Sequence, residues 1–355
     1  MRRRTWVLGV VAMVVLALVA AAVWVLTRGP STRLTEAVEV LPASAARVSF
    51  TDWAAVRAEV GDGVDADADE GEVQDFLDRA FDADLIATSG LWESTATLAS
   101  GYGFSPLDVE FEVVGQGTDG AVVALRLAAD ADLDAIAERL DDLGYAAPGD
   151  RTNGLWQGTD DILGRAGPSL SVLLRNLVLT DGWVLASDEP AFLDTATEVL
   201  RGDDDSLADT TGADRLLDAL GEESPTNAVL WPTDFVCEDL AMAQAGDADQ
   251  PVVDQLVDDA GGVAPLAGMA VARYSPRDLV VALGYQDDDR AAGDQAARLA
   301  LAGAEAVGKG GSWAERFAAS ASRHRDVVRL QLRPRPAAHG VLTEITRGPV
   351  SFATC

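Results

Sequence analysis

A run of 21 apolar residues, Trp6–Leu26, constrains this chain more than any other feature. A helix of that length is roughly 32 Å long, about the thickness of the apolar layer of a bilayer. Three arginines at positions 2–4 precede the run, which predicts that the N-terminus stays in the cytoplasm. We therefore expect a cytoplasmic basic tail over residues 1–5, a transmembrane helix over 6–26, and a globular part outside the cytoplasm.

A cleaved secretory signal is the alternative, because Ala20-Ala21-Ala22 resembles a cleavage site. The apolar part of a signal peptide is normally about 7–15 residues long, whereas this run continues past the alanines to Leu26. The length favours an uncleaved anchor, and cleavage after Ala22 stays open. Both interpretations place the bulk of the chain outside the cytoplasm.

The charge of the globular part excludes one class of partner. The chain has 27 basic and 58 acidic residues, a net charge of −31. Five of the arginines lie within residues 1–33, which hold no acidic residue, so the remainder carries −36. Such a surface repels phosphate groups, which proteins contact through Lys and Arg. We expect no binding to nucleic acid.

The remaining chain predicts an α+β fold. Residues 27–41 are punctuated by Gly29 and Pro30 and predict a linker. Helical and strand periods then alternate, and they predict antiparallel hairpins with helices packed on one face. We expect a first extracytoplasmic lobe over 42–225 and a second over 226–355.

Several segments carry clear periodic patterns. The alternation over 109–113 predicts a strand whose Glu110 and Glu112 face water. Asp181-Gly182, between two apolar runs, predicts a hairpin with a two-residue turn. A strand is also expected over Val327–Leu332, whereas the charged stretch before it, around His324, is typical of an exposed helix end. A helix is predicted from residues at the spacing of one buried face: Val73, Phe76, Leu77, Ala80 and Phe81.

The two lobes share a pattern. Thr51-Asp52-Trp53 and Thr233-Asp234-Phe235 each follow a predicted strand and open a predicted helix, 182 residues apart. Both lobes also continue with a hairpin and a further helix. A diverged duplication of a strand–helix–hairpin–helix unit explains this, and so does coincidence, because Thr and Asp are common at helix starts.

The best candidate for a ligand site is an acidic loop. Asp65, Asp67 and Asp69 match the first three ligand positions of a calcium-binding EF-hand loop. The match fails where such a loop needs a glycine, here Glu70, and where it needs a bidentate glutamate, here Phe76. We expect at most weak capture of Ca²⁺, and otherwise a solvated loop with no cofactor.

Residues for other chemistry are scarce. The chain has two histidines, His324 and His339, and no G-x-S-x-G, H-E-x-x-H or C-x-x-C motif. Its two cysteines, Cys237 and Cys355, predict a disulfide in an oxidising compartment, with two free thiols as the alternative. The sequence therefore predicts no catalytic residue.

The order of basic tail, single apolar segment and acidic α+β portion resembles that of many membrane-anchored bacterial envelope proteins. The resemblance is one of layout, and it implies a binding or scaffolding protein that contacts an envelope protein or polymer. Two other functions remain open. One is an envelope enzyme that uses paired carboxylates on glycans, and the other is a sensor domain that signals through a membrane partner.

Overall fold

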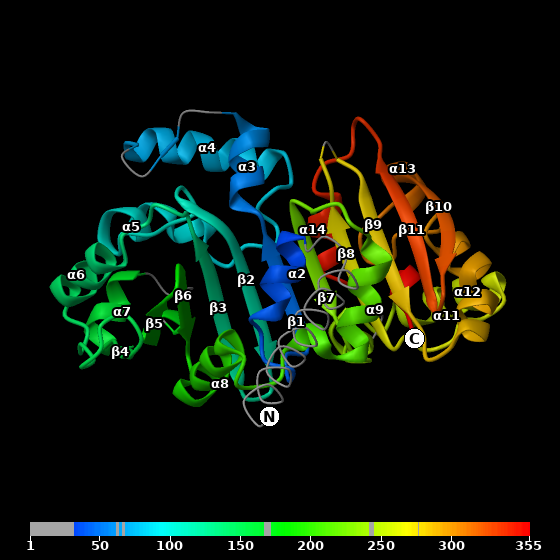
Figure 1. The fold of residues 1–355 in the computed structure, drawn as a ribbon. Helices are drawn as coiled ribbons and strands as arrows, with labels where there is room; N and C mark the ends of the chain where they lie inside the picture. The colour runs from blue at the N-terminus through cyan, green and yellow to red at the C-terminus, as the bar shows by residue number, and fades with distance from the viewer. Residues whose placement is uncertain (1–31, 62–63, 66–67, 167–171, 241–244, 276) are drawn as a thin grey trace, which may run out of the picture.

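The computed structural model describes residues 32–61, 64–65, 68–166, 172–240, 245–275 and 277–355. They form an α+β fold on one antiparallel sheet of 11 strands, in the order β10-β11-β9-β8-β7-β1-β2-β3-β6-β5-β4 (Figure 1). The predicted α+β class is confirmed. The strands are β1 (Arg47–Thr51), β2 (Val109–Gly117), β3 (Gly120–Leu127), β4 (Leu155–Gln157), β5 (Asn176–Thr180), β6 (Trp183–Ser187), β7 (Asn227–Trp231), β8 (Gly268–Arg273), β9 (Leu279–Gly284), β10 (Phe317–His324) and β11 (Val327–Pro334).

Helices cover both faces of the sheet, not one as predicted. The physical reason is that central strands such as β8 and β9 are buried at every position, so neither face can be left to water. The helices are α2 (Arg33–Glu39), α3 (Trp53–Val60), α4 (Glu70–Asp82), α5 (Thr95–Gly101), α6 (Leu133–Leu143), α7 (Asp160–Ala166), α8 (Pro190–Arg201), α9 (Thr211–Leu220), α10 (Val236–Asp239), α11 (Gln250–Ala260), α12 (Asp288–Leu301), α13 (Trp313–Arg316) and α14 (Val341–Thr346).

The sheet is built from two halves that meet where β1 pairs with β7. From that seam, one half runs β1-β2-β3-β6-β5 and the other runs β7-β8-β9-β11-β10. The first half has one more strand, β4, beyond β5. The other five strands of each half follow one another from the seam in the same order, and each seam strand is preceded by a helix, α2 or α9. The two Thr-Asp-aromatic motifs lie at the ends of the two seam strands: the first begins with Thr51, the last residue of β1, and the second begins with Thr233, two residues after the end of β7.

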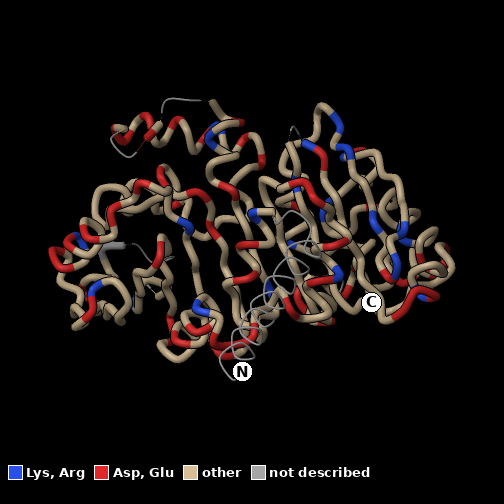
Figure 2. Tube along the Cα trace, in the orientation of Figure 1, with Lys and Arg blue, Asp and Glu red and all other residues tan. Residues whose placement is uncertain are grey.

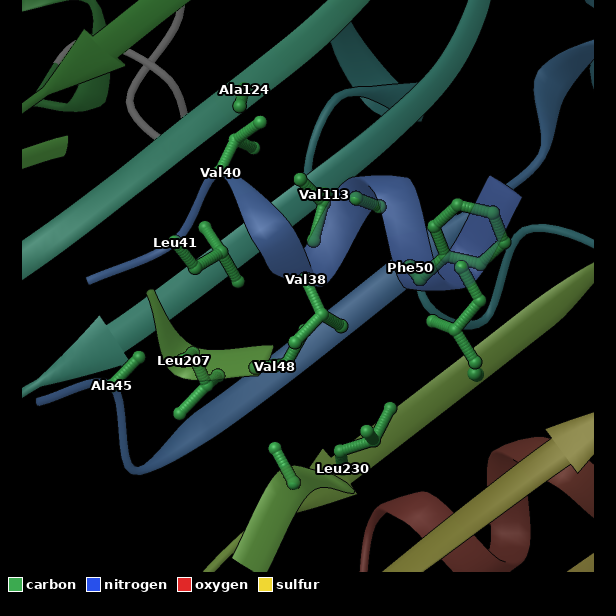
Figure 3. Packing of buried hydrophobic residues seen from close by; sticks show 14 of the residues in the cluster. Val38, Val40, Leu41, Ala45, Val48, Phe50, Val113, Ala124, Leu207 and Leu230 are labelled. Carbon is green, nitrogen blue, oxygen red and sulfur yellow. The ribbon is translucent and has the colours of Figure 1, made fainter. Parts of the chain in front are cut away.

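Three large hydrophobic cores, formed by described residues, fill the space between sheet and helices. One core extends across the seam on one face, under α2, α8 and α9, and Figure 3 shows its packing around Val48, Phe50 and Leu230. On the other face each half has a core of its own, under α3–α7 in the first half and under α10–α14 in the second. The halves therefore share one core and keep two separate ones.

The hairpin predicted at Asp181-Gly182 is confirmed as β5–β6. Both turn residues have positive φ, 43° and 79°, which is the backbone that this two-residue turn requires. The predicted helix over 73–81 is confirmed as α4, although Phe81 is 63% exposed because it lies beyond the edge of the buried face.

Two segments differ from expectation. The segment predicted as a linker, 27–41, contains α2, which buries Leu34, Ala37 and Val38 against the shared core. The stretch before His324, predicted as a helix end, is strand β10, which pairs with β11 along all eight of its residues. Its alanines and serines have low strand propensity, so its pairing with an apolar neighbour decides its conformation.

The two cysteines form the predicted disulfide. Cys237 in α10 is bonded to Cys355, with Cα atoms 5.8 Å apart and a sequence separation of 118. The buried guanidinium of Arg298 holds the same tail, because it donates to the carbonyls of Phe352 and Thr354 at 3.3 Å and 2.5 Å. The C-terminus is thus fixed to the core of the second half.

No helix among the described residues is long and apolar enough to cross a bilayer. The predicted transmembrane segment, Trp6–Leu26, lies outside the described residues.

We predict that Cys355→Ser lowers the free energy of unfolding by about 2–5 kcal/mol, because the bridge closes a long loop in the unfolded chain. Denaturant titration with and without reductant measures this. Reduced wild type should match the variant, and the variant should not respond to reductant. Equal stability of oxidised wild type and variant would contradict a stabilising bridge.

Candidate functional site

A cleft of about 240 Å³ opens where the arm formed by α3 and α4 meets the second half of the sheet. Its walls come from segments that are far apart in sequence and carry charges of both signs. They are Glu59, Asp82, Ala83, Asp84, Arg273, Arg277, Leu279, Pro334, His339, Gly340 and Val341.

One ion pair crosses the bottom of this cleft. Arg273, at the end of β8, donates to both carboxylate oxygens of Glu59 in α3, at 3.1 Å and 2.6 Å. The Arg273 side chain is 3% exposed and that of Glu59 is 21% exposed, so solvent screens the pair only partly. This bidentate contact ties the arm to the second half and occupies both groups.

Asp84 makes a second tie between the arm and the second half. It follows α4 with a φ of 60° and accepts from the backbone N–H of Leu342 at 2.7 Å and from the Thr343 hydroxyl at 2.6 Å. The carboxylate thus binds the first turn of α14, whose amides have no partner within the helix. Burial raises the pKa of Asp84, and these hydrogen bonds oppose the rise.

Few groups of the cleft are left to act on a ligand. Glu59 and Asp84 hold the structure together, which leaves Asp82 as the remaining carboxylate of the wall. Arg277 donates to the carbonyl of Ala338 at 2.6 Å, beside His339. The described lining therefore offers no free pair of carboxylates, which the hydrolysis of a glycan needs.

A buried polar cluster lies at the seam, between the two separate cores. Glu112 on β2 is 1% exposed and accepts from Trp53 Nε1 at 3.0 Å, the Ser89 hydroxyl at 2.7 Å and the Gly90 amide at 2.7 Å. None of these donors is a cation, so burial raises the pKa of Glu112 above its ordinary value. The sequence pattern predicted that the Glu112 side chain faces water. That prediction was wrong because a distant segment, residues 88–94, covers this face.

The same cluster continues across the seam. Asn227 on β7 donates to the Leu85 carbonyl at 2.7 Å and to the Thr88 hydroxyl at 2.9 Å. Thr88 also lies 2.7 Å from the hydroxyl of Thr51 on β1. The carbonyl of the Asn227 amide has no partner within the part of the chain that the structure describes. The cluster is enclosed, so we assign it to the joining of the halves.

The predicted calcium ligands do not form a described site. Asp69 caps α4, because its side chain accepts from the amides of Gly71 and Glu72. Asp67 lies outside the described residues, and Asp65 is four positions away from the cap. Among the described residues, no group of three or more His, Cys, Asp or Glu side chains is placed to hold a metal ion.

The histidines lie apart from the cysteines and from each other. His324 ends β10 and contacts Asp218 at 2.9 Å, whereas His339 lines the cleft. Both cysteines are consumed by the disulfide. The residues that sequence analysis singled out are therefore not brought together.

The two edge strands of the sheet, β4 and β10, differ in length and in whether other backbone segments pair with their outer sides. Strand β4 has three residues, and its outer side forms a bridge from Gln157 to Ala146. Strand β10 has eight residues in unbroken register with β11, and no described strand or bridge lies on its outer side. Natural proteins commonly shorten, bulge or cover such edges. Sequence analysis missed this edge, since its alanines and serines carry little strand signal.

Comparison of the sequence with family models found no match, and comparison with curated proteins found none either. Among solved structures, the chain is similar to one described as "Structure of crystal form I of TP0453", with 9% identity and a TM-score of 0.41. The alignment covers 92% of this chain and 100% of that chain. A similarity at this level carries no argument about function.

The raised pKa of Glu112 predicts a pH dependence. A carboxyl whose pKa rises on folding stabilises the fold fully below its ordinary pKa, and that contribution is lost as pH increases through the raised value. Acidification from about pH 7 to about pH 5 should therefore increase the free energy of unfolding. Glu112→Gln should show a smaller increase.

The control is Glu138→Gln, which removes one exposed carboxyl from α6 and should keep the wild-type dependence. Chemical denaturation at a series of pH values measures all three proteins. An identical pH slope for Glu112→Gln and wild type would contradict a raised pKa at Glu112.

Proposed function

We propose that this protein is a membrane-anchored binding module of the cell envelope, with its globular part outside the cytoplasm. The observation that carries the binding role is the uncovered eight-residue edge of β10. An exposed edge offers unpaired backbone groups to an extended segment of a partner, which is a common mode of peptide recognition.

Two observations support the placement outside the cytoplasm. The apolar run Trp6–Leu26 with its preceding arginines fits an anchor of N-inside orientation. The disulfide between Cys237 and Cys355 fits an oxidising compartment, since cytosolic thiols are normally kept reduced. An uncleaved anchor is the form that we propose, and it holds the binding edge near the membrane.

A carboxylate enzyme receives less support from the described residues. The cleft carboxylates Glu59 and Asp84 are bonded to the protein itself, and Glu112 is enclosed by Trp53 and the Ser89–Gly90 turn. A general acid must reach its substrate, and burial without access does not provide that. The cleft and the cluster act as structural ties in this account.

We also infer that the two halves arose by duplication of one unit. The support is the same order of the five strands nearest the seam on each side, together with the Thr-Asp-aromatic motif at the end of each seam strand. Coincidence explains three matching residues, but it does not explain five strands in the same order.

The anchor is tested by fractionation of cells that produce the full chain. We expect the protein in the membrane pellet at its full mass, resistant to carbonate extraction and digested by protease added to spheroplasts. Leu16→Arg combined with Val19→Arg should release it, because each arginine in the apolar layer costs about 3 kcal/mol. Recovery of the intact wild-type chain from the cytosol would overturn the placement.

The binding role is tested by photo-crosslinking in intact cells. A crosslinking amino acid at Ser320, on the open edge, should form adducts of defined mass, whereas the same residue at Glu138 on α6 should not. Adducts at both positions, or at neither, would contradict a binding role for the edge.

A further inference from the structure

The two halves of the sheet differ at one place. In the first half, β4 pairs antiparallel with β5. In the second half, β10 occupies the place that corresponds to β5, and no described strand takes the place of β4. Trp156 of β4 and Trp313 are both fully buried and both precede the second hairpin of their half, but Trp313 lies in the short helix α13. The second half thus ends one strand earlier.

Backbone groups of β10 point into this open place. In an antiparallel ladder, residues alternate between facing the partner strand and facing away. The closing pair His324–Val327 directs the even-numbered residues of β10 toward β11, so Ala319, Ala321 and Arg323 direct their amides outward. The amide side chain of Gln295 reaches the Ala321 carbonyl at 3.4 Å from that side. Within the described ranges, the outward amides of these three residues have no backbone partner.

The side chains along this edge leave room for another strand. Ala318, Ser320 and Ser322 are exposed on the face opposite α12, and the register contains no bulge. On the same face Arg329 and Arg333 of β11 lie directly across from Ser322 and Ala318. Because the side chains of Ser322 and Ala318 are small, they do not block the space between these two arginines and a strand added at the edge.

The hairpin is also basic in an acidic protein. Residues 317–334 contain four arginines and one aspartate, so they carry +3 in a chain of −31 (Figure 2). Arg325 is paired with Asp218 at 3.1 Å, and Arg333 lies 4.0 Å from Asp278. No ion pair is found for Arg323 or Arg329 within the described residues, and the Nε of Arg329 has no hydrogen-bond partner there.

We propose that β10 binds an acidic extended segment of a partner protein, which adds to the sheet as a further strand antiparallel to β10. The segment takes the place that β4 fills in the first half, and its carboxylates lie on the face of the sheet that carries Arg329 and Arg333. This inference rests on the proposed binding role and names the partner's chemistry. A second copy of this chain fits less well, because it would set one basic hairpin against another.

The probe for the test is an eight-residue peptide of alternating threonine and glutamate, acetylated and amidated at its ends and carrying a fluorophore. The full chain is held in lipid nanodiscs, and anisotropy reports binding. We expect saturation below about 1 mM peptide, weaker binding at higher salt, and at least about tenfold weaker binding when glutamine replaces glutamate. The lysine counterpart should not bind.

Variants locate the binding to the edge. Ala321→Pro removes an outward amide and leaves the β11 ladder intact, so it should weaken binding at least about tenfold, whereas Ala321→Val should bind as wild type does. Arg329→Gln combined with Arg333→Gln should weaken binding of the glutamate peptide and reduce its salt dependence. If Ala321→Pro lowers the melting temperature, its weaker binding could come from lost stability, and the double arginine variant then serves as the test of binding at the edge.

The proposal is overturned if the glutamate peptide does not bind, if it binds no better than the glutamine peptide, or if all the variants bind it equally. If the molecular mass in solution instead shifts from monomer to dimer as the protein concentration is increased, and Ala321→Pro stays monomeric, the edge binds a second copy of the chain. Membrane retention is measured separately, so these results overturn the partner's chemistry without affecting the anchor.

Discussion

The pairing of β1 with β7 is the interaction on which the rest of the structure depends. It joins strands that are about 180 residues apart through four residue pairs, from Val48–Leu230 to Thr51–Asn227, and makes one sheet from two halves. Because β7 is buried at every position and β1 at Val48, Phe50 and Thr51, the helices of both halves must cover the sheet, and one core extends across the junction. A sheet of this kind does not close on itself, so it has two edges, and their treatment differs between the halves.

Directional contacts complete the junction where apolar packing is interrupted. Thr51, Thr88 and Asn227 bond across the seam, and Glu112 holds the covering turn from β2. The Arg273–Glu59 pair and the contact of Asp84 with α14 fix the arm to the second half. Such polar contacts add little net stability, but they disfavour other registers, because a shift would leave buried groups unpaired. The titratable groups of the cleft and the seam therefore serve the architecture, and we assign the proposed recognition to the sheet edge.

Local patterns in the sequence predicted local structure well. The Asp181-Gly182 turn, the helix over 73–81 and the pairing of the cysteines follow from short-range chemistry or from a small count of residues. The cleft could not be predicted from the sequence, because tertiary packing alone brings its residues together, among them Glu59, Asp84, Arg273 and His339. Glu112 was misplaced because its cover comes from a loop about 20 residues earlier. Strand β10 was missed because a strand of alanine and serine is specified by its neighbour, not by its own propensity.

The open edge of β10 is tested most directly by hydrogen–deuterium exchange at residue resolution on the protein without added peptide. We expect the amides of Ala319, Ala321 and Arg323 to exchange at least about a hundredfold faster than the paired amides of β1 and β7, since no backbone acceptor among the described residues protects them. Protection of these three amides to the level of the seam strands would show that the edge is already covered, and it would contradict an open edge at β10.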